Sequence, residues 1–234
     1  MASKTYHIDG IGEVTIYKRR GTRRMNLRMA GAIVKVSQPL WLPYAAGVQF
    51  AQSNRNWIEQ QRVKRPVQLI DEAMQVGKSR ILRYEPDATL RTRITANELI
   101  IYLPAHLSIN SPEVQKIAKT AIKRALKKEA DAQLPERLAY CASKYGFSYT
   151  SVRCKSMRSR WGSCNNNQEI TLNIFLMMAP WELIDYVLIH ELAHTKHLHH
   201  GADFWDEVAR IMPDYKQRRK ALKDVQNTIA HLQA

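Results

Sequence analysis

One short segment, His190-Glu191-Leu192-Ala193-His194, constrains the fold of this chain more than any other feature. It ends a mostly apolar run that begins at Pro180, a residue suited to the first turn of a helix. The apolar positions of this run cover a broad surface, so we expect a helix buried in a core. Ionisable side chains on a buried helix are costly unless they are paired or bind a metal. The chain is therefore expected to fold around a buried polar centre.

The spacing within this segment predicts a metal site with its own base. Two histidines four residues apart lie on one helical face, about 5–6 Å apart at their Cβ atoms. Both imidazoles can then reach one zinc ion, at about 2.0–2.1 Å from nitrogen to metal. Glu191 stands beside that face, where it can take a proton from a metal-held water. We therefore interpret His190 and His194 as zinc ligands and Glu191 as the catalytic residue.

A catalytic zinc site needs a third protein ligand and one open position. Four residues that follow the motif are candidates: His197, His199, His200 and Glu207. His197 is seven residues beyond His190, about 10 Å further along a helix axis, which is too far to share the ion. The spacing does not choose among the other three.

Two blocks of sequence resemble the YgjP-like metallopeptidases, relatives of the SprT and WLM groups. One is Arg158-Ser159-Arg160-Trp161-Gly162-Ser163-Cys164, and the other runs from His190 to Trp205. The second block has a histidine before a small residue (His200, Gly201) and then Phe204-Trp205. A weaker likeness includes Arg23 to Arg28, so the resemblance spans most of the chain. The resemblance implies a zincin-like peptidase with His190, His194 and His200 as ligands and Glu191 as base.

The block from Arg158 to Cys164 has two interpretations for its arginines. Arg158 and Arg160 either pair with an acid such as Asp185 or Glu182, or hold a carboxylate or phosphate of the substrate bidentately. The sequence does not separate these alternatives. We expect Gly162 to permit a tight turn and Ser163 and Cys164 to pack in the loop, because a metal-activated water needs no covalent nucleophile.

Composition limits the cellular compartment and the partners that we expect for the protein. No run of eighteen apolar residues occurs, so we expect no membrane span and no membrane partner. Three cysteines without a framework of spacings, and an N-terminus without an apolar signal core, predict reduced thiols in a cytoplasmic protein. The net charge of +15 in 234 residues makes nucleic-acid contact through a basic surface a hypothesis.

The periodicity predicts an α+β protein in two parts: a mixed, mainly β module over 1–105 and a zincin-like catalytic domain over 106–234. In the first part we expect strands near 14–17, 25–29, 33–36, 81–84, 88–94 and 99–103. A helix is expected over 43–62, with Trp57 and Ile58 on its buried side. In the second part we expect a helix from Ser111, kinked or interrupted at Pro135, and strands over 148–155 and 169–174. No internal repeat appears in the sequence.

Three functions fit these features. The leading hypothesis is a zinc-dependent metallopeptidase that cleaves peptide or protein substrates by Glu191-assisted attack of a zinc-bound water, with an edge strand within 169–174 holding the peptide. An alternative is a metal-dependent hydrolase of nucleotide phosphoanhydrides, because the arginines could clamp phosphates. The third is a non-enzymatic nucleic-acid or partner-binding protein with structural zinc, which would need a fourth protein ligand.

Overall fold

The computed structural model of the chain describes residues 2–30, 33–64 and 69–233, which form two compact units divided at residue 68. Within the described residues, no helix is both long and apolar enough to cross a membrane. The division differs from the sequence-based boundary at residue 105. The strands between residues 75 and 103 share one hydrophobic core with the helix that follows them, so they belong to the second unit.

The first unit is a four-stranded sheet with two helices. Its sheet order is β1-β2-β4-β3, with a parallel pair in the centre and antiparallel pairs at both edges. Its elements are β1 (Ser3–Ile8), β2 (Gly12–Arg19), β3 (Asn26–Ala30), β4 (Ile33–Pro39), α1 (Tyr44–Ser53) and α2 (Arg55–Lys64). Alternate apolar residues of β2 and β4, such as Val14 and Val34, are fully buried, as expected for strands with one covered face.

The helical part of the first unit differs from the prediction over residues 43–62. It consists of two helices separated at Asn54, whose side chain donates a hydrogen bond to the carbonyl of Phe50 at the end of α1. Ile58 is fully buried, as expected, but Trp57 is 40% exposed. The predicted burial of Trp57 is therefore wrong, because the break in the helix changes which residues share a face.

The second unit begins with a sheet that repeats the topology of the first. Its order is β5-β6-β8-β7, again with a central parallel pair and antiparallel edges. These strands are β5 (Gln75–Val76), β6 (Arg80–Pro86), β7 (Arg91–Ile94) and β8 (Glu98–Leu103). The sequence does not show this repeat, because strand alternation tolerates many different residues on each face.

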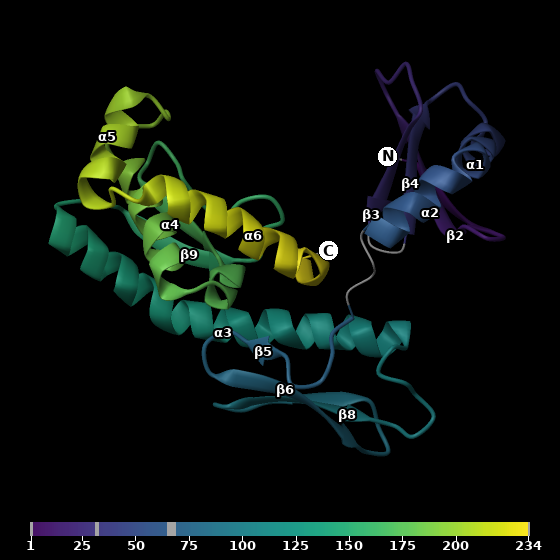
Figure 1. Cartoon of the computed structure of the whole chain (residues 1–234), viewed down its shortest axis with the longest axis horizontal. Helices are drawn as coiled ribbons and strands as arrows, with labels where there is room; N and C mark the ends of the chain where they lie inside the picture. Colours follow the sequence, from purple (N-terminus) through teal and green to yellow (C-terminus); the bar gives the residue numbers. More distant parts are fainter. Residues whose placement is uncertain (1, 31–32, 65–68, 234) are drawn as a thin grey trace. The chain divides into compact units, whose positions relative to one another are not determined.

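A long helix, α3 (Pro112–Tyr145), joins the two sheets of the second unit. In Figure 1 the sheet of β5 to β8 lies along one side of α3, and β9 and α4 lie along the other. The sequence predicts that Pro135 either kinks or interrupts this helix; Pro135 lies inside α3, which continues through it, so the interruption does not occur. Burial of one whole face of α3, including Leu126, Leu134 and Leu138, outweighs the loss of one backbone hydrogen bond at the proline.

The remaining elements position the polar centre. A small sheet has the order β10-β11-β9, made of β9 (Ser151–Lys155), β10 (Gly162–Cys164) and β11 (Glu169–Asn173). A 3₁₀ helix η1 (Ile174–Met178) leads into α4 (Trp181–Ala193), followed by α5 (Ala202–Ile211) and α6 (Tyr215–Gln233). The predicted α+β class is therefore confirmed, and α4 is the predicted helix after Pro180.

Candidate metal and peptide site

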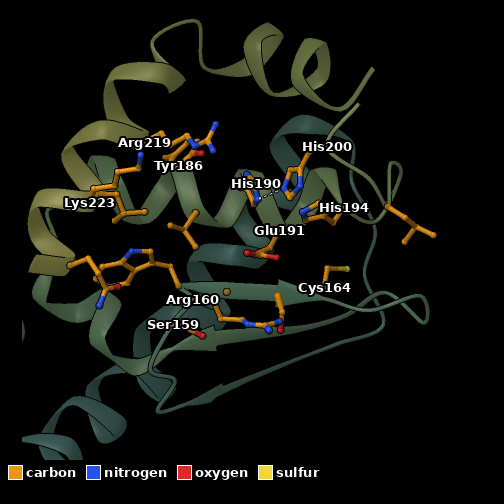
Figure 2. Close-up of a pocket in the computed structure, with 17 residues that line it drawn as sticks. Ser159, Arg160, Cys164, Tyr186, His190, Glu191, His194, His200, Arg219 and Lys223 are labelled. Atoms are coloured by element: carbon orange, nitrogen blue, oxygen red, sulfur yellow. Dashed lines mark hydrogen bonds between the residues drawn. The ribbon is translucent and has the colours of Figure 1, made fainter. Parts of the chain in front are cut away.

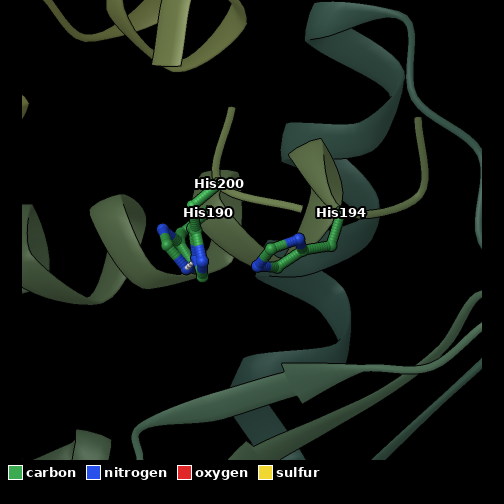
Figure 3. A group of neighbouring side chains, drawn as sticks. All are labelled: His190, His194 and His200. Atoms are coloured by element: carbon green, nitrogen blue, oxygen red, sulfur yellow. Dashed lines mark hydrogen bonds between the residues drawn. The ribbon is translucent and has the colours of Figure 1, made fainter. Parts of the chain in front are cut away.

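Helix α4 and the turn after it bring three histidines together. His190 lies in the last turn of α4, His194 caps the helix, and His200 lies just before α5. One ring nitrogen from each lies within 4.8 Å of the other two, and the Nε2 atoms of His190 and His200 are 3.1 Å apart (Figure 3). Two nitrogens on one tetrahedral zinc are separated by roughly 3.4 Å. The three side chains therefore converge as ligands of one ion do.

The other candidate ligands lie outside this group. Arg210 and Lys196 donate charged hydrogen bonds to the carboxylate of Glu207. These bonds lower the pKa of Glu207 to about 2. His197 contributes its backbone instead: its carbonyl lies 3.0 Å from Nδ1 of His194. A carbonyl only accepts, so Nδ1 of His194 must donate, which leaves Nε2 unprotonated and free to bind a metal.

The pKa values of all three imidazoles are lowered, which favours the neutral form that binds metals. Burial, and then the positive forms of His194 and His200, lower the pKa of His190 to about 3. The pKa values of His194 and His200 are also lowered, mainly by burial. Nδ1 of His190 is buried and has no hydrogen-bond partner within the described residues.

An aromatic wall holds the three rings in place. The buried Phe204 contacts all of them, with ring centroids 4.9, 4.5 and 4.8 Å from those of His190, His194 and His200. Trp205 stacks on His200 at 5.5 Å. These contacts give Phe204 and Trp205 a structural role beside the histidines, which the family resemblance alone does not explain.

Glu191 points into the same cavity from the buried side of α4. Its side chain is 4% exposed, and its Oε2 atom has no hydrogen-bond partner within the described part of the chain. Burial raises its pKa to about 8, an effect that the nearby Arg160 partly offsets. A buried carboxylate without a partner is costly, so this side chain is held ready for a group that the protein itself does not supply.

Gly162 makes room for this carboxylate. A Cβ atom at Gly162 would lie 2.5 Å from Oε1 of Glu191 and 2.7 Å from its Cδ. The backbone of Gly162 has no positive φ and lies in strand β10. The predicted turn at Gly162 is therefore wrong: a glycine is needed here for the close approach of Glu191.

The small sheet differs from the prediction of a substrate-binding edge within 169–174. Strand β11 is central, with β10 on one side and β9 on the other, so β10 is the edge strand beside the site. Between β10 and β11, the backbone N–H of Asn173 donates to the carbonyl of Trp161, and the N–H of Asn165 donates to the carbonyl of Glu169. In an antiparallel pair, hydrogen-bonded residues alternate with residues whose backbone groups point outward. Gly162 and Cys164 therefore direct their backbone N–H and C=O groups away from β11.

The two loop arginines occupy different places. Arg160 lines the cavity that contains Glu191 and the histidines, whereas Arg158 does not line it and lies near Lys123 of α3. Asp185, one of the acids suggested as their partner, is held by both Nε and Nη2 of Arg137, with the Nη2 bond at 2.8 Å. Arg137 comes from α3, and no local pattern in the sequence indicates this pairing.

The cavity has a volume of about 610 Å³ and also includes residues that the sequence analysis did not select. Helix α6 contributes Arg219, Leu222, Lys223 and Gln226 to its wall (Figure 2). Arg219 also lowers the pKa of His190 and of His200. The sequence does not distinguish these residues from the rest of the basic run in α6, because lysines and arginines at helical spacing usually lie on a solvated surface.

Residues 23–225 match the family model described as "YgjP-like, metallopeptidase domain". The class is therefore that of the metallopeptidases. Within that class, the chain belongs to the YgjP-like family, as the two sequence blocks indicated.

Two solved structures are similar to part of the chain. The metallopeptidase zymogen abylysin of Pyrococcus abyssi is 25% identical over 38% of this chain and 91% of its own, with a TM-score of 0.36. The metallopeptidase zymogen jannalysin of Methanocaldococcus jannaschii is 20% identical over 42% of this chain and 98% of its own, also with a TM-score of 0.36. A search of curated proteins gave no match.

Proposed function

We propose that this member of the family is a zinc-dependent peptidase, with His190, His194 and His200 as metal ligands and Glu191 as general base. One observation carries the proposal. Three imidazoles converge beside a buried carboxyl oxygen of Glu191 that has no partner within the described residues. If the histidines had only a structural role, a buried and unpartnered Glu191 beside them would destabilise the fold without any benefit.

The donor set fits zinc in a catalytic site. Imidazole nitrogen is a preferred zinc ligand, and three protein ligands leave one coordination position open. In residues 2–30, 33–64 and 69–233, the candidate cluster contains these three histidines and no fourth histidine, cysteine or carboxylate. A structural zinc site would need that fourth ligand, so the cluster favours an enzyme over a metal-stapled binding protein.

The chain's own residues account for proton transfer. When bound, zinc would polarise the scissile carbonyl and lower the pKa of a water molecule. A zinc ion held by the neighbouring histidines would favour the ionised form of Glu191, against the rise in its pKa caused by burial. The free Oε2 atom of Glu191 would then accept the proton of the attacking water and pass it to the leaving amine. The carbonyl of His197 would hold His194 in the ligating tautomer throughout.

The edge strand β10 offers a place for an extended peptide. The outward N–H and C=O groups of Gly162 and Cys164 could bond a peptide backbone by strand addition. Both residues line the cavity together with Glu191. A peptide on this edge would lie next to the general base, which favours a peptide bond over a phosphoanhydride as the bond that is cleaved.

The test compares wild-type protein with Glu191→Gln. Both are assayed for zinc content, for cleavage of denatured proteins, and for release of phosphate or pyrophosphate from nucleotides. We expect equal zinc and a loss of peptide cleavage in the variant of at least about 100-fold. Glu207→Gln is the matched control, because Glu207 lies outside the cluster. Peptide cleavage that survives Glu191→Gln contradicts the proposal, and Glu191-dependent nucleotide hydrolysis without peptide cleavage moves the function to the alternative.

Recruitment by nucleic acid is part of the proposal and is supported by the first unit. Residues 1–68 contain twelve lysines and arginines against three acids, and residues 14–58 contain no acid. Five exposed arginines follow each other around the β2–β3 connection: Arg19, Arg20, Arg23, Arg24 and Arg28. Such a surface favours binding to phosphates.

DNA binding measured against salt concentration tests this. Replacing Arg20, Arg23 and Arg24 by alanine should lower the slope of log K against log salt by about three, close to one for each phosphate that is no longer neutralised. Binding that is absent, or independent of salt, contradicts it.

Two further assignments remain proposals. The three free cysteines support the cytoplasm as the compartment, because unpaired thiols persist where thiols are kept reduced. The catalytic part is proposed to lie in residues 106–234, since α4, the following turn and β10 all lie within it. A chain piece that starts at residue 69, where the second compact unit begins, should bind zinc as the whole chain does; loss of zinc in this piece would show that the site also depends on residues 1–68.

A further inference from the structure

Three cations line the cavity without an acidic partner. Arg160, Arg219 and Lys223 are exposed residues of its wall, and Glu191 is the acid among the lining residues. None of the three cations takes part in an ion pair within the described residues. Arg218, next to Arg219 in α6, is different: it pairs with Asp214 and donates a hydrogen bond to the carbonyl of Glu182.

The position of Arg219 is set by an aromatic stack that starts at the histidine cluster. Its guanidinium lies 5.3 Å from the ring centroid of Trp205, and Trp205 lies 5.5 Å from the ring of His200. The other stacking partner of Trp205 is Tyr215, at 5.1 Å. An extended peptide of about three residues covers the span from His200 to Arg219, at about 3.3 Å per residue.

The cations lie on two sides of the reacting centre. In Figure 2, Arg219 and Lys223 approach from α6, Arg160 approaches from the opposite wall, and Glu191 lies between them. A cavity lined by charges of one sign raises the local concentration of oppositely charged ligands. Guanidinium groups bind carboxylates through paired hydrogen bonds, which adds geometric selection to the charge.

We infer that Arg219 and Lys223, together with Arg160, select substrates that carry a carboxylate within about three residues of the cleaved bond. This rests on the proposed peptidase function and adds a substrate class to it: peptides with Asp, Glu or a C-terminal carboxylate near the bond. Peptides with lysine or arginine at the same place are repelled. A phosphate has the same anionic chemistry, so nucleotides form a separate arm of the test.

The experiment uses quenched fluorescent peptides that differ only by Glu or Gln at one position, placed in turn at each of three positions on both sides of the bond. Wild type, Arg219→Gln and Lys223→Gln are compared with Lys220→Gln, which makes the same change on α6 outside the cavity. We expect wild type and Lys220→Gln to prefer Glu at one or two positions by about 10- to 100-fold in kcat/KM, the range of a charged hydrogen bond. Arg219→Gln and Lys223→Gln should reduce that preference, with the main change in KM.

Binding to the Glu191→Gln protein, followed by fluorescence anisotropy, separates this inference from the proposed function. If Glu peptides bind more tightly than Gln peptides, and Arg219→Gln in the same background removes the difference, the inference holds even when no peptide is cleaved. If wild type cleaves peptides without a preference for Glu, or keeps the preference in both α6 variants, the inference is wrong while the peptidase stands. Binding of a nucleoside triphosphate that depends on Arg219, without any preference among the peptides, also overturns it.

Discussion

Replacing Gly162 by alanine should disable the site while leaving the metal in place. The new Cβ would lie 2.5 Å from Oε1, 2.6 Å from Cγ and 2.7 Å from Cδ of Glu191. Carbon atoms in ordinary contact are about 3.5–4.0 Å apart, so the carboxylate must move by about 1 Å. Strand β10 cannot yield easily, because it is paired with β11 along its length.

A displacement of about 1 Å in a catalytic group costs roughly 100-fold in rate. Crowding of this kind also costs about 1–3 kcal/mol of stability. We therefore expect Gly162→Ala to fold, to bind zinc in wild-type amounts and to lose about 99% of its kcat/KM on a denatured-protein substrate. The measurements are kcat/KM, zinc content and the free energy of unfolding in urea.

The matched control is Gly201→Ala, next to the candidate ligand His200. Nothing lies within 4 Å of a Cβ atom at Gly201, and its φ is not positive. This variant should keep activity within about threefold, because the added methyl group meets no neighbouring atom. Alanine is a poorer N-cap residue than glycine, so we expect a loss of stability of about 1 kcal/mol. Equal activity in Gly162→Ala and Gly201→Ala would refute the reasoning, and so would a loss of zinc in Gly162→Ala.

Three further predictions concern the ligands, the core and pH. His200→Ala should weaken zinc binding by more than the roughly 10- to 100-fold typical of removing an outer hydrogen bond, whereas His199→Ala should not, as measured by competition with a chelator; equal affinities would contradict the ligand assignment. Arg80→Ala leaves the buried Glu129 without its charged partner at 3.1 Å, and should cost about 3–5 kcal/mol in urea unfolding; a loss under about 1 kcal/mol would contradict this. Burial and the nearby acids Asp71 and Glu72 raise the pKa of Tyr84 from 10.0 to about 12, so the unfolded chain loses this proton first and stability should fall as pH rises between those values. Tyr84→Phe should flatten that fall relative to wild type, and an unchanged curve would speak against it.

The helix that carries the site is predictable because its signals are local. Pro180, the apolar run and the i, i+4 histidines all act within a few turns, and α4 begins and ends close to where they indicate. The strands of the two larger sheets follow from alternation in the same way. The repeat of sheet topology does not, since two sheets can share an order without sharing residues.

The third ligand depends on a turn rather than on a periodic element. Spacing left His199, His200 and Glu207 open, and only the resemblance selected His200. In the structure the chain reverses after α4, and the contact of His194 with the carbonyl of His197 helps to fix that reversal. No periodicity describes such a turn, so no spacing rule could place the ring.

Contacts between residues that lie far apart in the sequence could not be predicted either. Gly162 has its role because Glu191, 29 positions later, approaches it from another element. Asp185 is held by Arg137, which is 48 positions away on α3. Edge strand β10 was missed because three residues are too few to show alternation. Each of these contacts arises from packing between elements, which one sequence does not encode as a local pattern.

The most direct test of the central claim is the count of zinc ligands in the zinc-loaded protein by X-ray absorption spectroscopy. The account predicts three imidazole nitrogens and one oxygen from water, with one imidazole fewer in His200→Ala. Four protein ligands, or any sulfur ligand from Cys164, would contradict it, because a closed site leaves no position for substrate and gives Glu191 no water to deprotonate.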